Sequence, residues 1–430
     1  MITAPALGGS AASRPIDEEV PATALWVLSA QIAIFLAIWF GFGVTIFSTT
    51  LVTLIQFSLV GAALLLGPRG RLGRVIVSWP LLVFFGWWAS SIAWSQSQWG
   101  WQLRTSTTLP PVLAVVVAAS LLPVRHLKRI MVFSFTAMVL FGAFIMLTQY
   151  PTAKEFRDAT TYLPGWRGSF VHKNIFAMTS GIALLVVLSF ARRGWLRRLV
   201  AALAVLFILM SRSATGAAAL LVVAVGLPWY AAYRSRRGRM TSAFAFVSVL
   251  LGTMLVAVTA MIFPWLISLY GKDPTLSGRT DIWASVWQVA EQKPWHGWGI
   301  GGVFIEFAQE PTNGIIRRVG FFFPHSHNGY LELFLLLGVV GLALWLAIAI
   351  STLWAGARLV WIDAATSQVA TLYVVILLLL NVSEVVVTDG YMAVLVMLRV
   401  LTARVRLDQR APIGDGRPLL PGDVTGAIRR

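Results

Sequence analysis

Residues 327–356 read HNGYLELFLLLGVVGLALWLAIAISTLWAG and include only one Asp, Glu, Lys or Arg, which is Glu332. A helix needs about 20 consecutive apolar residues to cross the hydrocarbon core of a bilayer. This stretch therefore predicts a transmembrane helix. Comparable apolar runs lie at residues 22–42, 44–67, 75–93, 105–122, 130–149, 173–191, 199–211, 214–233, 240–266, 327–356, 368–388 and 390–405. The sequence thus predicts an all-α integral membrane protein with about 12 transmembrane helices.

The composition excludes a soluble domain. Of the 430 residues, 58% are hydrophobic and 12% are charged, and the mean hydropathy is +0.78. A soluble domain usually carries about twice that charged fraction. The net charge of +17 does not predict a nucleic-acid partner, because the Lys and Arg residues cluster between the apolar runs, as membrane topology requires. Without cysteine, the chain has no disulfide and no thiolate metal site.

Basic clusters follow every second apolar run, and this alternation predicts the orientation in the membrane. The clusters comprise Arg69, Arg71 and Arg74; Arg125, Lys128 and Arg129; Arg192, Arg193, Arg197 and Arg198; Arg234, Arg236, Arg237 and Arg239; and Arg404, Arg406 and Arg410. Cytoplasmic connectors carry an excess of Lys and Arg, so both termini are expected in the cytoplasm. We expect a cytoplasmic tail at 1–21 rather than a cleaved signal, a polytopic membrane domain at 22–405, and a second cytoplasmic tail at 406–430.

The opposite, outward face holds two long connectors, at about residues 150–172 and 267–326. Long loops without apolar spans of their own are commonly functional. The larger loop is expected to contain short amphipathic helices. Ser277 or Thr280 can cap a helix that starts at Asp281 and stops before Pro294. One face of this helix is aromatic, which predicts that it lies on the bilayer surface; this face comprises Trp283, Val286, Trp287 and Ala290.

The motif at residues 324–332 combines two histidines with an intramembrane carboxylate. His325 and His327 stand just before the tenth apolar run, where a residue with a near-neutral pKa can act as a base. Glu332 lies about one and a half turns deeper, and a carboxylate inside an apolar helix is costly unless it has a partner. The residues alone do not choose between the two histidines. The alternative is that the polar groups merely cap the helix.

Three further motifs bring cations to the outward face. Arg212 stands in a tight turn between two apolar runs, where a guanidinium can grip a phosphate or, alternatively, snorkel to the interface. Arg279 stands at the expected helix start in the large loop, a natural anion site or half of an ordinary Arg–Asp pair. Arg167, His172 and Lys173 precede the sixth run, where an interfacial belt is the alternative.

The outward loops contain no paired Asp motif suited to a divalent metal. No metal and no other cofactor is therefore expected. If a diphosphate leaves at this face, arginines must stabilise its charge.

These motifs resemble the superfamily of O-antigen ligases and Wzy-type polysaccharide polymerases. The resemblance rests on His327 and Asn328 followed by Gly338 and Gly341, on residues 277–283 and 293–299, on residues 211–213, and on residues 168–174. It covers roughly residues 160–345. Residues 168–174 are closest to the exopolysaccharide-polymerase (ExoQ-like) branch.

The resemblance implies a metal-independent, inverting glycosyltransferase of the bacterial inner membrane. Its donor would be an oligosaccharide linked to polyprenyl (undecaprenyl) diphosphate, used at the periplasmic face. His327 matches the family's catalytic histidine, and Arg212 and Arg279 match the arginines that bind the diphosphate. Substrate-binding roles are expected for the neighbouring residues, which are Arg167, His172, Lys173, His325, Asn328 and Glu332.

The resemblance leaves the acceptor open. A polymerase extends another lipid-linked glycan, as in exopolysaccharide biosynthesis, whereas a ligase transfers the glycan to lipid A–core in lipopolysaccharide assembly. Membrane lipids, a chain-length regulator and export machinery are the further partners to expect. A lipid-linked oligosaccharide transporter is the alternative from another class, although it should show related halves and a polar path at the midplane. A non-catalytic scaffold would leave the outward Arg and His residues unexplained.

Overall fold

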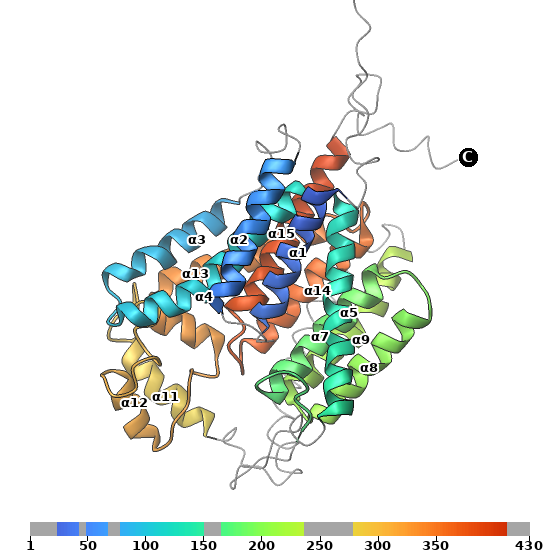
Figure 1. The fold of residues 1–430 in the computed structure, drawn as a ribbon. Coiled ribbons are helices and arrows are strands. Elements are labelled where there is room, and N and C mark those ends of the chain that lie inside the picture. Colours follow the sequence, from blue (N-terminus) through green and yellow to red (C-terminus); the bar gives the residue numbers. More distant parts are fainter. Residues whose placement is uncertain (1–23, 43–48, 68–77, 150–164, 236–277, 411–430) are drawn as a thin grey trace, which may run out of the picture.

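A computed structural model of the chain describes residues 24–42, 49–67, 78–149, 165–235 and 278–410. These residues form helices and connecting turns, with no strand among them (Figure 1). The helices are α1 (Leu25–Gly41), α2 (Thr49–Leu66), α3 (Trp79–Ser90), α4 (Gln98–Leu121), α5 (Val124–Thr148), α7 (Lys173–Phe190), α8 (Trp195–Ser211), α9 (Ala214–Ser235), α11 (Arg279–Ala290), α12 (Thr312–Val319), α13 (Gly329–Ala357), α14 (Ala364–Leu380) and α15 (Asp389–Arg410).

The all-α membrane fold predicted from the sequence is confirmed. Eleven of the twelve apolar runs coincide with a described helix, and the twelfth, 240–266, lies outside the described residues. Among the described helices, five are long and apolar enough to cross a membrane, namely α4, α5, α7, α9 and α13. The boundary at 405 falls inside a helix, because α15 continues to Arg410. The apolar run ends at residue 405, whereas the helix continues through the polar residues that follow, up to Arg410.

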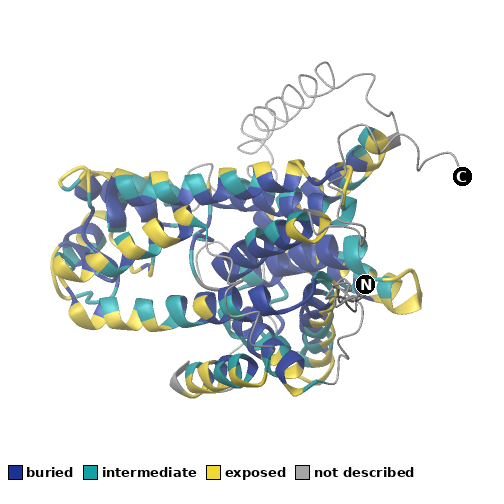
Figure 2. Cartoon of the chain, turned by 90° about the horizontal axis from the view of Figure 1, so that it is seen from above, coloured by how far each residue is buried: buried dark blue, intermediate teal, exposed yellow. Residues whose placement is uncertain are grey.

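The core of the bundle lies around α1, α14 and α15. Figure 2 shows the buried residues concentrated on the faces of the helices that point into the bundle, and the buried side chains of α1, α14 and α15 belong to one hydrophobic cluster. Residues 392–398 of α15 are all at most 1% exposed, so this part of the helix is buried and apolar on every side. Small residues also allow α7 and α9 to pack closely. A Cβ at Gly216 of α9 would lie only 2.4 Å from the Cβ of Ala177 in α7, so only glycine fits there.

The arginine-rich helix ends gather at one end of the bundle. Lys128 at the start of α5 pairs with Asp363 before α14. Arg406 near the end of α15 donates to the carbonyl of Ala355 at the end of α13 (3.0 Å). Arg197 of α8 donates to the carbonyl of Leu188 in α7 (2.8 Å). The described helices that follow one another run in opposite directions, so the described connectors without basic clusters lie at the opposite end of the bundle (Figure 1).

Helix α13 is interrupted at Gly338, whose φ is 67° and whose backbone is not helical. The interruption leaves carbonyls without their helical donors, and the turn that precedes it in sequence satisfies them. The N–H groups of Trp298 and Gly299 donate to the carbonyls of Leu335 and Leu336 (2.9 and 2.8 Å). A Cβ at Gly338 would lie 2.2 Å from the carbonyl oxygen of Trp295. The glycine therefore allows the outer loop to pack directly against a broken membrane helix.

The loop helix α11 begins earlier than predicted. It starts at Arg279, and its N-cap is Gly278, whose φ of 81° is readily adopted by glycine, with no side-chain cap. Thr280 therefore lies inside the helix, and Ser277 lies outside the described residues. Figure 1 shows α11 and α12 together at one corner of the bundle.

The buried face of α11 also differs from the predicted aromatic face. Ile282, Val286 and Val289 are nearly fully buried in a cluster with residues of α12 and α13, whereas Trp287 is 53% exposed. The helix packs on α13 because its aliphatic side chains find an apolar partner there. It does not lie alone as an aromatic-faced surface helix.

Candidate functional site

The histidine loop, residues 324–328, leads directly into α13 and is held by that helix. Asn328 is the N-cap, and its Oδ1 accepts from the backbone N–H groups of Tyr330 and Leu331 (both 3.0 Å). The buried Glu332 accepts the N–H of Ser326 through Oε2 (2.9 Å). Asn328 and Glu332, two of the predicted substrate-binding residues, thus accept hydrogen bonds from backbone N–H groups of the same chain. These N–H groups would otherwise lack a partner at the start of the helix.

The two histidines of this loop lie against each other. Their ring centroids are 4.2 Å apart, and the N–H of His327 donates to Nδ1 of His325 (3.2 Å). Because Nδ1 of His325 accepts this bond, the proton of the neutral ring must be on Nε2. His327 has a φ of 55°, an uncommon conformation for a residue with a Cβ. Backbone strain of this kind concentrates at functional sites.

Both histidines are held in the neutral form. Burial, with the nearby charges of Arg104, Arg279 and His172, lowers the pKa of His325 to about 4. Burial, with His325, Arg279 and His172, lowers the pKa of His327 to about 2. The two imidazoles therefore share a site with Arg279 and His172, which the sequence separates by many residues.

Helix α11 joins the histidine loop to the turn between α14 and α15. The indole Nε1 of Trp283 donates to the carbonyl of Ser326 in the histidine loop (3.0 Å). One turn earlier, Arg279 donates through Nη1 to the carbonyl of Ser383 (2.5 Å) and through Nη2 to Oε1 of Glu384 (3.0 Å). The predicted pairing of Arg279 with a carboxylate exists, but the partner is Glu384 rather than the adjacent Asp281.

A polar network continues from Glu384 to two other predicted motifs. Oε1 of Glu384 also accepts from Nδ2 of Asn174 at the start of α7 (2.6 Å). Oδ1 of Asn174 in turn accepts from Oγ of Ser213 (2.8 Å), and that Oγ shares a hydrogen bond with Thr215 (2.8 Å). Four segments of the chain thus meet in one line of contacts: the starts of α11, α7 and α9, and the α14–α15 turn.

The other predicted residues near this network are His172, Lys173 and Arg167. His172 is the N-cap of α7, and its Nδ1 accepts the N–H of Asn174 (3.2 Å). Lys173 is 3% exposed, and Arg167 donates to carbonyls of its own turn, those of Phe170 and Val171 (both 3.4 Å).

Arg212 differs from these residues because its side chain is exposed. It ends α8 in the left-handed conformation, with φ at 50°. No hydrogen bond or ion pair joins its side chain to another described residue. The structure places it beside Ser213 of the network, and no direct contact with the histidine pair is seen.

Residues 177–346 match the family model described as O-antigen ligase. This segment is similar to the O-antigen ligase family. It includes Arg212, Arg279, His325 and His327, which supports the resemblance derived from the motifs. No curated protein matches the chain. The protein is thus a multi-pass membrane enzyme of polysaccharide assembly, while its exopolysaccharide-polymerase branch stays a prediction.

The O-antigen ligase segment does not contain all the residues that complete the site. Asn174 precedes it and Glu384 follows it, yet both contact each other between its elements. Arg104 of α4 lies close enough to influence the charge of His325, and the sequence analysis did not select it. One signal could have found it: like Arg212, it is an arginine at the outward end of an apolar run. Within the described ranges, no three His, Cys, Asp or Glu side chains are grouped to hold a metal ion.

The start of α13 depends on the absence of a side chain at Gly329. Its N–H donates to the carbonyls of Asn381 and Glu384 (2.8 and 3.0 Å), and a Cβ there would lie 1.8 Å from Oδ1 of Asn381. Gly329→Ala should therefore destabilise the folded protein by about 1–3 kcal/mol, the usual cost of overpacking. The thermal unfolding midpoint in detergent measures this loss.

The matched control is Gly86→Ala in α3, where a Cβ meets nothing within 4 Å. This variant should unfold at the wild-type temperature or slightly above it, because alanine favours a helix over glycine. Equal midpoints for the two variants would mean that the α13 start does not need this close approach.

Proposed function

We propose that this protein is a metal-independent, inverting glycosyltransferase that extends a polysaccharide from a polyprenyl-diphosphate-linked oligosaccharide donor. The observation that carries the proposal is the neutral pair His325–His327 beside Arg279, at the end of the bundle away from the basic clusters. A neutral imidazole can accept a proton, and a guanidinium can bind a leaving diphosphate.

The diphosphate is bound by arginine side chains. Arg279 uses one N–H for the carbonyl of Ser383 and one for Glu384, which leaves three of its five N–H groups for phosphate oxygens. Glu384 holds the guanidinium in place before substrate arrives, so little reorganisation is needed. Arg212 has its whole guanidinium available.

His327 accepts the proton of the acceptor. The acceptor hydroxyl oxygen attacks the anomeric carbon, the bond from this carbon to the diphosphate oxygen breaks, and the polyprenyl diphosphate leaves as an anion. The hydroxyl proton passes to His327. Nε2 receives this proton, which requires the proton of the neutral ring to be on Nδ1, an atom that is buried without a hydrogen-bond partner among the described residues. Burial is the main cause of its low pKa, and the charge of Arg279 adds to the effect; a bound diphosphate offsets that charge and makes the ring a stronger base.

Asn328 and Glu332 act as positioning residues in this scheme. They bind the backbone of the histidine loop and so fix where the imidazoles stand. His325 presents Nε2–H as a donor, either to the acceptor or to the diphosphate.

The low pKa values predict an unusual pH dependence. A base with the ordinary histidine pKa of about 6.5 would lose activity about tenfold per pH unit below that value, because the protonated ring cannot accept a proton. With folded-state values of about 4 and about 2, both rings stay unprotonated down to about pH 5. We therefore expect kcat/KM to change by less than about twofold between pH 8 and pH 5.5.

The measurement is kcat/KM across this range, since that ratio reports the free enzyme. A decline of about tenfold between pH 8 and pH 5.5 would show that a base with an ordinary histidine pKa of about 6.5 carries the reaction.

We place the site at the periplasmic face of the bacterial inner membrane, with both termini in the cytoplasm. The basic helix ends lie at the other end of the bundle, and such ends face the cytoplasm.

The acceptor is proposed to be another lipid-linked glycan, so that the enzyme is a polymerase. The second candidate is a ligase that transfers the glycan to lipid A–core, favoured by the description of the matching family. Purified protein with a polyprenyl-diphosphate oligosaccharide, with and without lipid A–core, separates these functions. A ladder of products without core supports the polymerase, and transfer only with core supports the ligase. Absence of transfer under both conditions would contradict a transferase and favour the transporter.

A further inference from the structure

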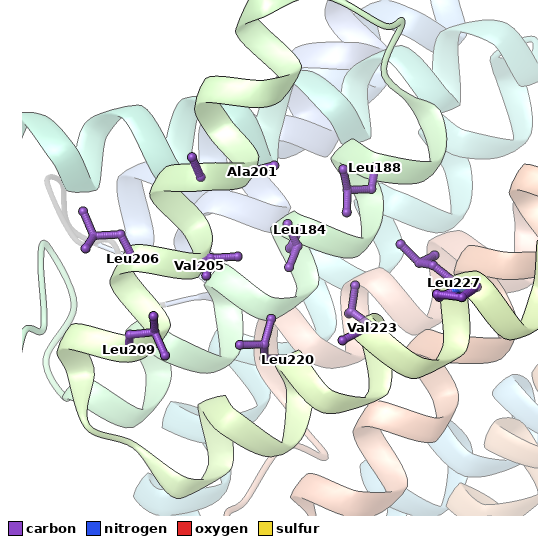
Figure 3. A pocket seen from close by; sticks show the side chains of 12 residues that line it. Leu184, Leu188, Ala201, Val205, Leu206, Leu209, Leu220, Val223 and Leu227 are labelled. Atoms are coloured by element: carbon purple, nitrogen blue, oxygen red, sulfur yellow. The ribbon is translucent and has the colours of Figure 1, made fainter.

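An apolar cavity of about 710 Å³ lies among α7, α8 and α9 (Figure 3). Helices α8 and α9 each pack extensively along α7 and much less against each other, which leaves a groove between them with α7 as its floor. All twelve side chains that line it are aliphatic. Representative residues are Leu184 and Leu188 of α7, Val205 and Leu209 of α8, and Leu220 and Val223 of α9. The volume is typical of a ligand site, and the lining suits a hydrocarbon chain rather than a sugar.

The groove ends at the proposed diphosphate-binding residues. Leu209, at one end of its wall, accepts the backbone N–H of Arg212 through its carbonyl (3.2 Å). The next residue, Ser213, begins the polar network that leads through Asn174 and Glu384 to Arg279. An apolar chain in the groove would therefore reach an exposed guanidinium at the point where the apolar lining stops.

The groove runs from the outward end of α8 towards the basic end of the bundle. Its wall on α8 extends from Ala201 to Leu209, which corresponds to about 12 Å along a helix. At the other end lies Leu188, whose carbonyl accepts a hydrogen bond from the guanidinium of Arg197 (2.8 Å). A chain bound here would place its head group at Arg212, at the outer edge of the membrane.

We propose that this groove binds the first part of the polyprenyl chain of the donor, with the attached diphosphate at Arg212. The inference rests on the proposed function, because it adds a lipid-binding subsite to that donor site. The diphosphate and the chain are covalently joined, so the chain must leave the polar site where Arg212 stands. Exposed apolar side chains beside the groove, Leu206 and Leu221, border a path from the surrounding lipid.

Photo-crosslinking of the full-length protein in nanodiscs tests this proposal. The probe is a polyprenyl diphosphate with a diazirine in the isoprene units nearest the diphosphate. We expect labelling within residues 184–188 and 199–228, the segments that line the groove, competed by unlabelled polyprenyl diphosphate and not by excess phosphatidylglycerol. Labelling outside these residues, or equal competition by phosphatidylglycerol, would overturn the proposal in favour of a general lipid groove.

A pair of adjacent substitutions provides the matched control. Ala224→Phe fills the groove with a ring, whereas Val225→Phe adds a ring at a neighbouring exposed position that does not line it. We expect Ala224→Phe to reduce crosslinking at least about fivefold and Val225→Phe less than about twofold. In a transfer assay, Ala224→Phe should also reduce the preference for a long-chain over a short-chain donor.

Equal labelling of both variants would exclude the groove as the binding site. Labelling of the unmodified chain needs no variant, so a folding defect does not obscure the result. Correct labelling without glycosyl transfer would retain the groove and reject the proposed function, which keeps the two failures distinguishable.

Discussion

Replacing His327 by alanine should reduce glycosyl transfer by about 10²–10⁴-fold, the usual contribution of a general base. The ring is buried against His325 and faces the charge of Arg279, and we propose that it receives the acceptor's proton. The variant should insert and fold, because the α13 cap and Glu332 still hold the loop. Transfer rates with purified protein, normalised to monomeric protein on size exclusion, measure the effect.

His325→Ala is the internal comparison for this result. It removes the acceptor of the His327 N–H and hence one hydrogen bond that positions the loop. A lost bond of this kind costs about 1 kcal/mol, or a factor of about 5–10 in rate if it acts only on position. A larger loss for His325→Ala than for His327→Ala would assign the base to His325 instead.

Replacing Arg279 by alanine should lower kcat by about 10²–10³-fold, the usual effect of removing one group that stabilises developing negative charge. The guanidinium is the described cation that both affects the histidine pair and retains N–H groups for phosphate. Arg279→Lys should recover little of the rate, because an ammonium cannot donate to Ser383, Glu384 and a diphosphate in the same fork geometry.

Loss of Arg279 also has a structural consequence that the experiment must separate. Glu384 has a side chain 9% exposed, and removing one partner of such a buried pair typically costs about 3–5 kcal/mol. The double variant Arg279→Gln with Glu384→Gln leaves no buried charge and keeps neutral hydrogen-bonding groups. We expect it to recover the thermal midpoint without recovering transfer. Recovery of both would show that the arginine serves only the fold.

Much of the fold was predictable because membrane helices are specified locally. The apolar runs and the alternating basic clusters are both properties of contiguous segments, and the described helices follow them. The errors occur where a helix boundary depends on a partner. α11 starts at Arg279 rather than Asp281 because Gly278 adopts a left-handed backbone, and its buried face is set by α12 and α13.

The glycines of the outer loop show the same limit. The glycine-rich turn at residues 297–302 packs closely on the interrupted helix α13 and on α4. A Cβ at Gly301 would lie 2.0 Å from the backbone of Gly100, and one at Gly297 would lie 2.5 Å from that of Leu336. Glycine is needed at these positions because segments far apart in the sequence pack against the turn too closely for a side chain. A local sequence pattern does not reveal such contacts.

For the candidate site, the sequence by itself determined the chemical groups: two adjacent histidines, outward arginines and the motifs that carry the family resemblance. It also determined the membrane helices, since burial in lipid requires long apolar segments. Only the tertiary structure decided how these groups meet. It paired Arg279 with Glu384 rather than Asp281 and joined Asn174 to Ser213. It also placed an apolar groove beneath Arg212. Such contacts depend on which helix ends come together, and packing between segments far apart in the chain decides that.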